Sequence, residues 1–439
     1  MPSINLQELR GKIGQRAKSA PSHRFWGMHV HIVKRETLEA SYLLAKAKAG
    51  APGSDGETFD VIEARGRDQF LTELESELRV GTYTPRPCRR REIPKENGKV
   101  RVISIACIRD RVVQGAIRLI LEPIFEADFS DSVMGARPGR SAHGALDRVR
   151  EALLRRRHWV ADVDLASYFD TIRHAPLLSK LARRISDGHV MALVKQFLRS
   201  TGTRGIPQGS PLSPLLANIA LNDLDQALDR GRNFITYVRY LDDMVVLAPK
   251  SSTGRRWAAR ALERIREEAA AIGVAVNEEK TRLVTMTDAK SHFAFLGFEF
   301  WWVQSLKSGK WFPYTRPRPK KVRAVLRAVR ETLRANRHLA VQDAVQRVNP
   351  IVRGWANYFR RGNSARALGS VKFHVERKVR RFAAKQRGRR GFGWKRWSSD
   401  VVYNQWGLFG DYHVLVAPIV RESAHRPSGT ITSLDDAHG

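Results

Sequence analysis

Apolar and polar residues alternate along this chain in different ways, and each pattern predicts a different kind of structure. Residues 1 to about 85 show a helical pattern with a glycine-rich loop at 50–56, whereas residues 86 to about 305 alternate between strand and helix patterns. Helices return from about residue 320 to 385. Their apolar stripe recurs at three- and four-residue steps and consists of Val322, Val325, Leu326, Val329 and Leu333. The proline-rich segment 313–319 is predicted to be the linker before these helices.

Two adjacent carboxylates stand between two apolar runs. Residues 234–239 and 244–248 are rich in apolar and β-branched residues and predict two strands, so the sequence Tyr-Leu-Asp-Asp at 240–243 falls at the turn of a hairpin. Asp242 and Asp243 at such a turn can reach a divalent metal ion. The pair alone is weak evidence, because most Asp-Asp pairs are solvated turn residues.

A second carboxylate site strengthens the metal hypothesis. Residues 160–172 predict a buried strand that places Asp162 and Asp164 on one face, and the bulky pair Tyr168-Phe169 follows. Phosphoryl transfer with two metals requires carboxylates from separate elements to hold ions about 3.5–4 Å apart. Asp164 could complete this set with the two hairpin aspartates. For Asp162, a cap or a pair with a nearby arginine is the better interpretation.

Charge indicates the kind of partner. The 77 lysines and arginines exceed the 44 aspartates and glutamates and give a formal net charge of +33, which favours a polyanion. A membrane surface is the competing partner, but the sequence has no run of about 18 apolar residues and no signal-peptide pattern at its start. Cys88 and Cys107 are expected to be reduced packing residues, which predicts a cytoplasmic protein. With a polyanion as the expected partner, the protein is expected to associate with the nucleoid or with ribonucleoprotein.

Ordered sequence blocks from about residue 24 to 412 resemble the group II intron-encoded reverse transcriptases. The blocks similar to that family's N-terminal extension, fingers, palm and maturase region are 24–27, 50–56, 93–101, 108–114, 121–125, 135–141, the block around Asp164, 205–218, 240–243, 277–281, 295–298 and 354–359. So many blocks in the expected order make chance similarity implausible.

The resemblance implies an α+β right-hand polymerase, with fingers and palm followed by a helical thumb or maturase region. It divides the chain into an N-terminal extension and start of the fingers at 1–85, fingers and palm at 86–305, thumb at 306–395, and a basic aromatic tail at 396–439 that resembles a DNA-binding remnant. The implied activity is RNA-directed DNA synthesis with two Mg²⁺ ions, or Mn²⁺ in their place. The implied partners are group II intron RNA for splicing and retrohoming, an RNA template, a DNA primer or target, and dNTPs.

The resemblance also assigns site residues. It gives Asp164, Asp242 and Asp243 to catalysis and, with Leu165, to metal binding; the residues that it gives to nucleotide binding are Lys95, Arg101, Leu165, Ala166, Phe169, Gln208 and Lys280. Phe169 would exclude a ribose 2′-hydroxyl by clash. Simpler alternatives remain: an exposed basic hairpin at 93–101, a core phenylalanine, a helix-entry loop around Gln208, and a surface lysine at 280.

Basic residues interleaved with aromatic residues predict a nucleic-acid surface in the last third of the chain. The predicted contacts are Lys372, Arg377, Arg380, Arg381, Arg387, Arg389, Arg390, Lys395 and Arg396, with Arg137 and Arg140 added from the fingers block. The interleaved aromatics are Phe373, Phe382, Phe392, Trp394 and Trp397. A solvated basic face is the alternative.

Two departures from the family pattern matter. Leu241 replaces the alanine that usually precedes the paired aspartates, and the residues after Trp406 lack the cysteine and histidine pairs of an appended HNH nuclease domain, so self-contained DNA cleavage is not expected. Two other functions therefore stay open. One is an RNA-binding maturase that no longer polymerises, against which the intact aspartates argue; the other is a domesticated or defence-associated reverse transcriptase.

Overall fold

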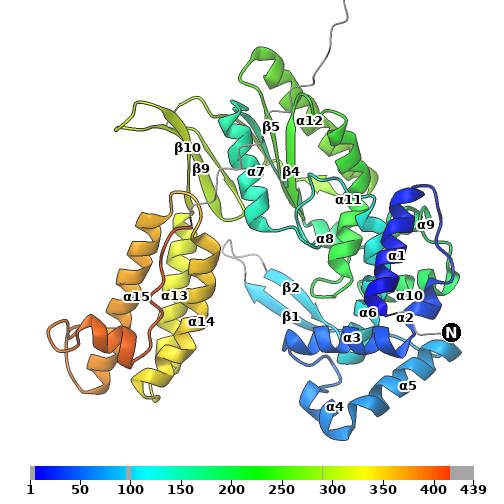
Figure 1. Ribbon diagram of the computed structural model, residues 1–439, viewed down its shortest axis with the longest axis horizontal. Coiled ribbons are helices and arrows are strands. Elements are labelled where there is room, and N and C mark those ends of the chain that lie inside the picture. Colours follow the sequence, from blue (N-terminus) through cyan, green and yellow to red (C-terminus); the bar gives the residue numbers. More distant parts are fainter. Residues whose placement is uncertain (1–4, 95–99, 289, 416–439) are drawn as a thin grey trace, which may run out of the picture. The chain divides into compact units, whose positions relative to one another are not determined.

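The computed structural model describes residues 5–94, 100–288 and 290–415 (Figure 1). Internal contacts separate two compact units, Met1–Tyr314 and Thr315–Gly439. Both helices and sheets are present, which confirms the predicted α+β class. The finer division at residues 85, 305 and 395 stays a prediction.

The first unit begins with helices, as the pattern predicted. They are α1 Leu6–Ser19, α2 Met28–Ile32, α3 Arg35–Ala47, α4 Phe59–Arg65 and α5 Arg67–Val80. Helix α3 packs against the long helix α6, Ile108–Glu126, where Ser41 donates a 2.7 Å hydrogen bond to the carbonyl of Val112. Leu38 and Tyr42 of α3 are buried, and the Tyr42 ring contacts Phe59 and Phe70. Burial of these apolar faces stabilises the helices more than their intrinsic propensity does.

A sheet of five strands forms the centre of the first unit. Its order is β4-β5-β3-β6, with β7 also pairing with β3. The strands are β3 Trp159–Ala166, β4 Thr236–Tyr240, β5 Asp243–Ala248, β6 Ala275–Val276 and β7 Arg282–Thr285. Its strand pairs are antiparallel, and helices α7 Ala142–Leu154 and α12 Ser252–Ala271 pack on the sheet (Figure 1). Residues 244–248 are buried throughout, so this strand lies within the core.

Further helices surround the sheet, and a separate two-stranded ladder precedes α6. The helices are α8 Tyr168–Thr171, α9 His174–Ala182, α10 Gly188–Arg199 and α11 Ser213–Asp229. The ladder joins β1 Arg89–Pro94 to β2 Val100–Ile105 and pairs Ile93 with Arg101. Lys95 lies outside the described residues, and only the main chain of Arg101 is described, so their assignment to the nucleotide stays a prediction.

The predicted linker at 313–319 is wrong. Its first part belongs to β10 Trp311–Pro317, the edge strand of a three-stranded sheet with β9 Phe298–Gln304 and β8 His292–Phe295. Pro313, Thr315 and Pro317 are buried on alternate positions, which is a strand pattern. An edge strand tolerates proline because one side of its backbone needs no ladder hydrogen bonds.

The second unit is helical, as predicted. It contains α13 Pro319–Ala335, α14 Val341–Phe359, α15 Ala365–Gln386 and a short π-helix, Val401–Gln405. Val325, Val329 and Leu333 from the predicted stripe are buried in its core together with valines of α14 and α15. Across the parts of both units that the structure describes, no helix is long and apolar enough to cross a membrane.

Candidate functional site

The two adjacent aspartates lie at a tight turn between β4 and β5. Tyr240 pairs with Asp243, so Leu241 and Asp242 alone form the connection, which confirms the predicted hairpin. Leu241 has a φ of 57°, in the left-handed region that a branched residue seldom adopts. Such a conformation persists only where the surroundings hold it, and it is common at functional sites.

Asp164 lies opposite Asp243 in the ladder between β3 and β5. Its Oδ2 accepts hydrogen bonds from Nζ of Lys280 at 3.0 Å and from Nδ2 of Asn277 at 3.1 Å. The main-chain N–H of Asn277 also donates to the Asp164 carbonyl at 2.8 Å. The structure therefore brings Lys280 to the carboxylate site. Asn277 was not predicted as a site residue, although it stands three positions before Lys280 in the same sequence block.

The carboxylates of this turn repel one another. Desolvation, together with the negative charges of Asp242 and Asp164 and a smaller effect of Asp162, raises the pKa of Asp243 from 3.8 to about 6. The residue as a whole is nevertheless exposed at the turn, so solvent screens part of this effect. Asp162 itself forms an ion pair with Arg282 at 3.2 Å, which agrees with its predicted pairing to an arginine. The neighbouring carboxylates therefore produce a negative electrostatic field at Asp243, and the positive charge of Lys280 offsets it only in part.

The donor set suits a hard cation. Within the described residues no three His, Cys, Asp or Glu side chains are already arranged as a metal-binding group. Nevertheless, Asp164, Asp242 and Asp243 offer only carboxylate oxygens, the ligands that Mg²⁺ prefers. Lys280 and Asn277 both bind the same oxygen of Asp164, Oδ2. Binding a cation here would relieve the repulsion that raises the pKa of Asp243.

Phe169 and Gln208 line a common cavity of about 640 Å³, next to residues of β2, α3 and α6. The main chains lock the two segments together, because the N–H of Ile206 donates to the Phe169 carbonyl at 2.6 Å. Gln208 donates through Nε2 to Asp170 at 3.0 Å. Tyr168 is buried and donates to the Ala217 carbonyl at 2.5 Å, so the core interpretation holds for Tyr168. Phe169 is half-buried and packs against the core as well as lining the cavity, so its role beside the sugar stays a prediction.

Leu165 and Ala166, which the resemblance gave to the same pocket, end the central strand. They pair with Val276 and Ala275 of β6, and the Leu165 side chain is buried. The loop that carries Gln208 approaches β2 closely: a Cβ at Gly209, whose φ is 111°, would lie 2.9 Å from the Ser104 carbonyl oxygen. Glycine is therefore required here for close backbone approach.

Arg137 is not a nucleic-acid contact. Its side chain is 3% exposed, is paired with Glu126 at 2.7 Å, and donates to the Val133 carbonyl at 3.0 Å. A guanidinium that is already buried and paired has no donor available for phosphate, so the prediction for this residue is wrong. Arg140 remains partly exposed beside Asp131.

A basic pocket of about 810 Å³ lies in the second unit. Helix α13, helix α15 and the segment that follows each of them supply its lining. The lining residues are Arg330, Leu333, Arg334, Arg337, His374, Arg377, Lys378, Arg381, Phe382, Lys385, Gln386 and Phe392. The Arg377 guanidinium lies over the Phe392 ring, 4.3 Å from its centroid. Burial and the charges of Arg330, Arg377 and Arg381 lower the pKa of Lys378. None of these twelve described lining residues carries a carboxylate that would balance this charge.

Arg377 and Arg381 were predicted nucleic-acid residues, whereas the α13 arginines were missed because the apolar stripe of that helix was its only recognised signal. The prediction for Arg380 is wrong: its side chain is 2% exposed and paired with Glu376 at 2.6 Å. Trp397, 6% exposed, belongs to the core and is not a stacking platform. The predicted residues Lys372, Arg387, Arg389, Arg390, Lys395 and Arg396 are exposed or half-buried.

Comparisons with known families agree with this arrangement. Residues 93–300 match the family described as "Reverse transcriptase (RNA-dependent DNA polymerase)", and residues 322–399 match "Group II intron, maturase-specific domain". The first match contains the aspartate turn together with Phe169 and Gln208, and the second contains the basic pocket.

Individual relatives show the same similarity. The chain is 32% identical to Protein YkfC of Escherichia coli over 343 residues, which are 66% of this chain and 87% of that protein. It is 36% identical over 212 residues to the group II intron-encoded protein LtrA of Lactococcus lactis subsp. cremoris, covering 46% of this chain and 35% of LtrA. A solved structure, the partial Cas6-RT-Cas1–Cas2 complex, is 23% identical and covers 55% of this chain and 41% of that chain, with a TM-score of 0.32.

Proposed function

Because the chain belongs to the family of group II intron-encoded reverse transcriptases and maturases, we propose that it extends a DNA primer on an RNA template with Asp164, Asp242 and Asp243 as its catalytic carboxylates. The observation that carries this assignment is the meeting of carboxylates from two strands, where desolvation and repulsion from Asp242 and Asp164 raise the pKa of Asp243 to about 6. A pure binding protein gains nothing from this repulsion.

The three aspartates would hold two Mg²⁺ ions, with Mn²⁺ as the alternative. When bound, such ions activate the primer hydroxyl and neutralise the leaving pyrophosphate. Lys280 and Asn277 would orient the Asp164 side chain, because both donate hydrogen bonds to its Oδ2 atom. We include Leu165 in the metal site and Ala166 in the nucleotide site only as the family resemblance gives them.

The incoming dNTP would lie in the cavity that Phe169 and Gln208 share. Phe169 lines this cavity, and its ring would exclude a ribose 2′-hydroxyl because of its size. Lys95 and Arg101 would bind the triphosphate, as the family resemblance gives them.

The helical unit would bind RNA through its basic pocket. Many arginines and lysines with no carboxylate among the described lining residues suit phosphates, and Phe392 suits an unstacked base. We propose template RNA and the intron RNA, whose splicing and retrohoming it would assist, as the ligands of this surface.

Primer extension on an RNA template tests the assignment. Asp242→Asn and Asp243→Asn should each lower the extension rate at least about a thousandfold, equivalent to roughly 4 kcal/mol, because each removes a metal ligand. Asp60→Asn, which changes an exposed aspartate on α4, is the matched control. RNA affinity should not change in any of the three variants. Extension at the normal rate by both site variants would refute the polymerase assignment and favour a maturase that only binds RNA.

A further inference from the structure

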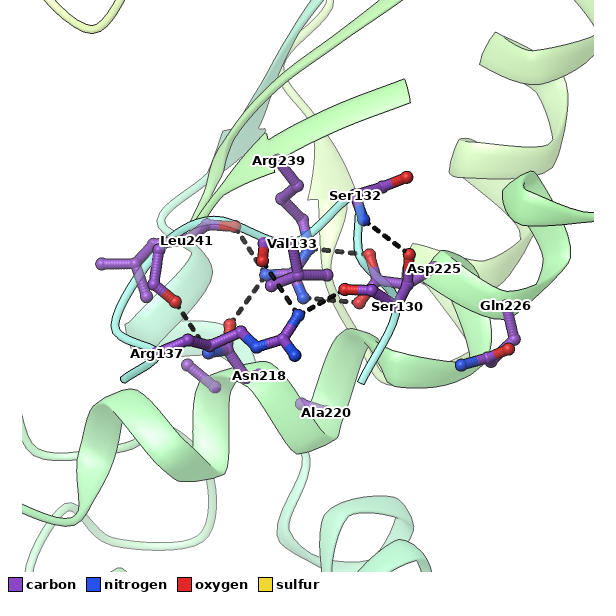
Figure 2. Close-up of polar contacts among 12 residues, drawn as sticks. Ser130, Ser132, Val133, Arg137, Asn218, Ala220, Asp225, Gln226, Arg239 and Leu241 are labelled. Atoms are coloured by element: carbon purple, nitrogen blue, oxygen red, sulfur yellow. Dashed lines mark hydrogen bonds and ion pairs between the residues drawn. The ribbon is translucent and has the colours of Figure 1, made fainter. Parts of the chain in front are cut away.

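Arg239 is the fully buried neighbour of the catalytic turn. It lies on β4, one residue before Tyr240, and its side chain is 0% exposed (Figure 2). Its Nε and Nη2 atoms donate to the two carboxylate oxygens of Asp225 on α11, at 2.7 and 2.5 Å. Tyr237 donates to the same carboxylate at 2.9 Å. The charge of Asp225 outweighs burial and raises the pKa of Arg239, so the guanidinium stays charged.

The remaining nitrogen of Arg239 reaches the turn itself. Nη1 donates to the carbonyl of Leu241 at 3.0 Å and to Oδ1 of Asn218 at 3.1 Å. The Leu241 carbonyl belongs to the peptide bond that carries Asp242. The atoms of a peptide bond lie in one plane. A hydrogen bond that holds the Leu241 carbonyl therefore also restrains the Asp242 nitrogen and Cα, from which the Asp242 side chain extends.

The loop formed by residues 132–135 also packs closely against the turn. Asn218 donates through Nδ2 to the Gly135 carbonyl at 2.9 Å, and a Cβ on Gly135 would lie 2.6 Å from the main-chain nitrogen of Leu241. Main-chain hydrogen bonds tie the same loop to Arg239, whose N–H donates to Ser132 and whose carbonyl accepts from Met134. Arg137 anchors the loop by binding the carbonyls of Ser130 and Val133 (Figure 2).

We infer that Arg239, Asn218 and the loop 132–135 act as a positioning bracket that holds Leu241 in its left-handed conformation and sets the place of Asp242. This inference rests on the proposed polymerase function. A fully buried ion pair contributes little net stability, because desolvation of both charges offsets their attraction. Holding the turn in place gives the ion pair a role other than stability. A rigid turn does not have to reorganise during the reaction, which favours catalysis.

Gly135→Ala is the gentlest test, because it adds one methyl group against the turn and leaves every charge in place. Gly135 does not have a positive φ, so alanine causes no backbone strain of that kind. We expect kcat for primer extension to fall about ten- to a hundredfold, since misplacement by about 1 Å has effects of this size. KM for dNTP should change little, whereas the melting temperature should fall, because the added methyl group meets main-chain atoms of Tyr240 and Leu241 that must move. Gly11→Ala, on α1 with open space around it, is the matched control.

Mn²⁺ binding to the protein without nucleic acid gives a readout independent of activity. Titration followed by electron paramagnetic resonance should show weaker Mn²⁺ binding by Gly135→Ala and unchanged binding by Gly11→Ala. Unchanged kcat together with unchanged Mn²⁺ affinity would overturn the bracket. If Asp243→Asn leaves extension intact, the polymerase function fails, whereas Mn²⁺ binding still reports on the geometry of the turn.

A second test removes the buried ion pair and the tyrosine hydroxyl bound to it, and leaves Asn218 in place. The triple variant Tyr237→Phe, Asp225→Leu and Arg239→Met replaces these groups with apolar side chains of similar size, which buried ion pairs often tolerate. If Arg239 positions the turn, the folded variant keeps its melting temperature but its kcat falls about a hundredfold. Arg184→Met, which removes a buried arginine paired with Asp128 away from the turn, should lower stability and spare kcat. Normal kcat in the folded triple variant would show that the network only packs the core; if this variant does not fold, Gly135→Ala decides.

Discussion

Asp164 and Asp243 face each other across the ladder of β3 and β5, and the positive charge of Lys280 lies 3.0 Å from Oδ2 of Asp164. Desolvation and the neighbouring carboxylates keep a proton on Asp243 to higher pH than on an ordinary aspartate, even though Lys280 lowers this pKa in part. In the protein without a metal ion, these carboxylates therefore repel one another, and a bound divalent cation would reduce this repulsion.

The raised pKa predicts how stability depends on pH. Between about pH 4 and pH 6 the unfolded chain has already lost the Asp243 proton while the folded chain retains it, so this residue lowers the free energy of unfolding as pH rises through that window. Without metal, Asp243→Asn should therefore match the wild type near pH 4 and become the more stable protein above pH 6. Thermal unfolding measured from pH 4 to 7.5 with a chelator present tests this.

Asp223→Asn provides a control of opposite sign. Burial opposes ionisation of Asp223, but Lys180 and Arg183 outweigh it and lower its pKa. Removing this carboxylate should cost stability at neutral pH, and the difference should shrink as pH falls through the lowered pKa. A pH-independent difference for Asp243→Asn would show that the turn carboxylates do not interact as proposed.

Phe169 predicts a change in sugar discrimination. Phe169→Val or Phe169→Ala should raise incorporation of ribonucleotides relative to deoxyribonucleotides, because the ring no longer blocks the 2′-hydroxyl. We expect roughly a ten- to hundredfold shift in the ratio of kcat/KM values, measured by single-nucleotide incorporation. Phe59→Val, a core substitution in α4, should lower stability without changing that ratio. An unchanged ratio in a folded Phe169 variant would place the discrimination elsewhere.

Local patterns predicted the elements of the catalytic site well. Period-two alternation predicted the strand that carries Asp164, which pairs with Asp243 in the β3-β5 ladder, and the apolar flanks of Asp242 and Asp243 defined the turn. Such patterns depend on near neighbours in sequence, which is why they were visible. The strand at 311–317 was missed because its two prolines resemble a linker, and only its edge position makes them compatible with a sheet.

Partners distant in sequence could not be predicted. Arg137 is buried against Glu126, eleven residues away in another element. Glu376 does stand four residues before Arg380, but the sequence does not show that this pair is buried while Arg377 is exposed. The link from Arg239 to Asp225 likewise joins a strand to a helix whose packing had to be known first. Charge composition predicts the kind of partner, whereas tertiary packing decides which charges are available to bind it.

Arg380 and Arg377 should therefore behave differently when each is replaced by methionine. Arg380→Met leaves Glu376 buried without its cation and should destabilise the helical unit by roughly 3 kcal/mol, with RNA binding by the folded protein nearly unchanged. Arg377→Met should weaken RNA binding and leave the melting temperature within a few degrees. Calorimetry and RNA titration of both variants provide the comparison, and equal effects on binding would contradict the burial argument.

The basic pocket predicts a steep salt dependence of RNA affinity that belongs to its own arginines. Replacing Arg334, Arg337, Arg377 and Arg381 with glutamine should weaken binding and lower the slope of log affinity against log salt by roughly 0.7 to 0.9 for each phosphate that the protein no longer neutralises. Replacement of the same four residues with lysine keeps the charge and should keep most of the slope. A parallel variant neutralising the exposed residues Arg387, Arg389, Arg390, Lys395 and Arg396 separates the pocket from the tail. If the slope follows only the tail variant, the pocket does not bind phosphate; if it follows neither, RNA is held by the first unit, and the excess of positive charge in the pocket needs another explanation.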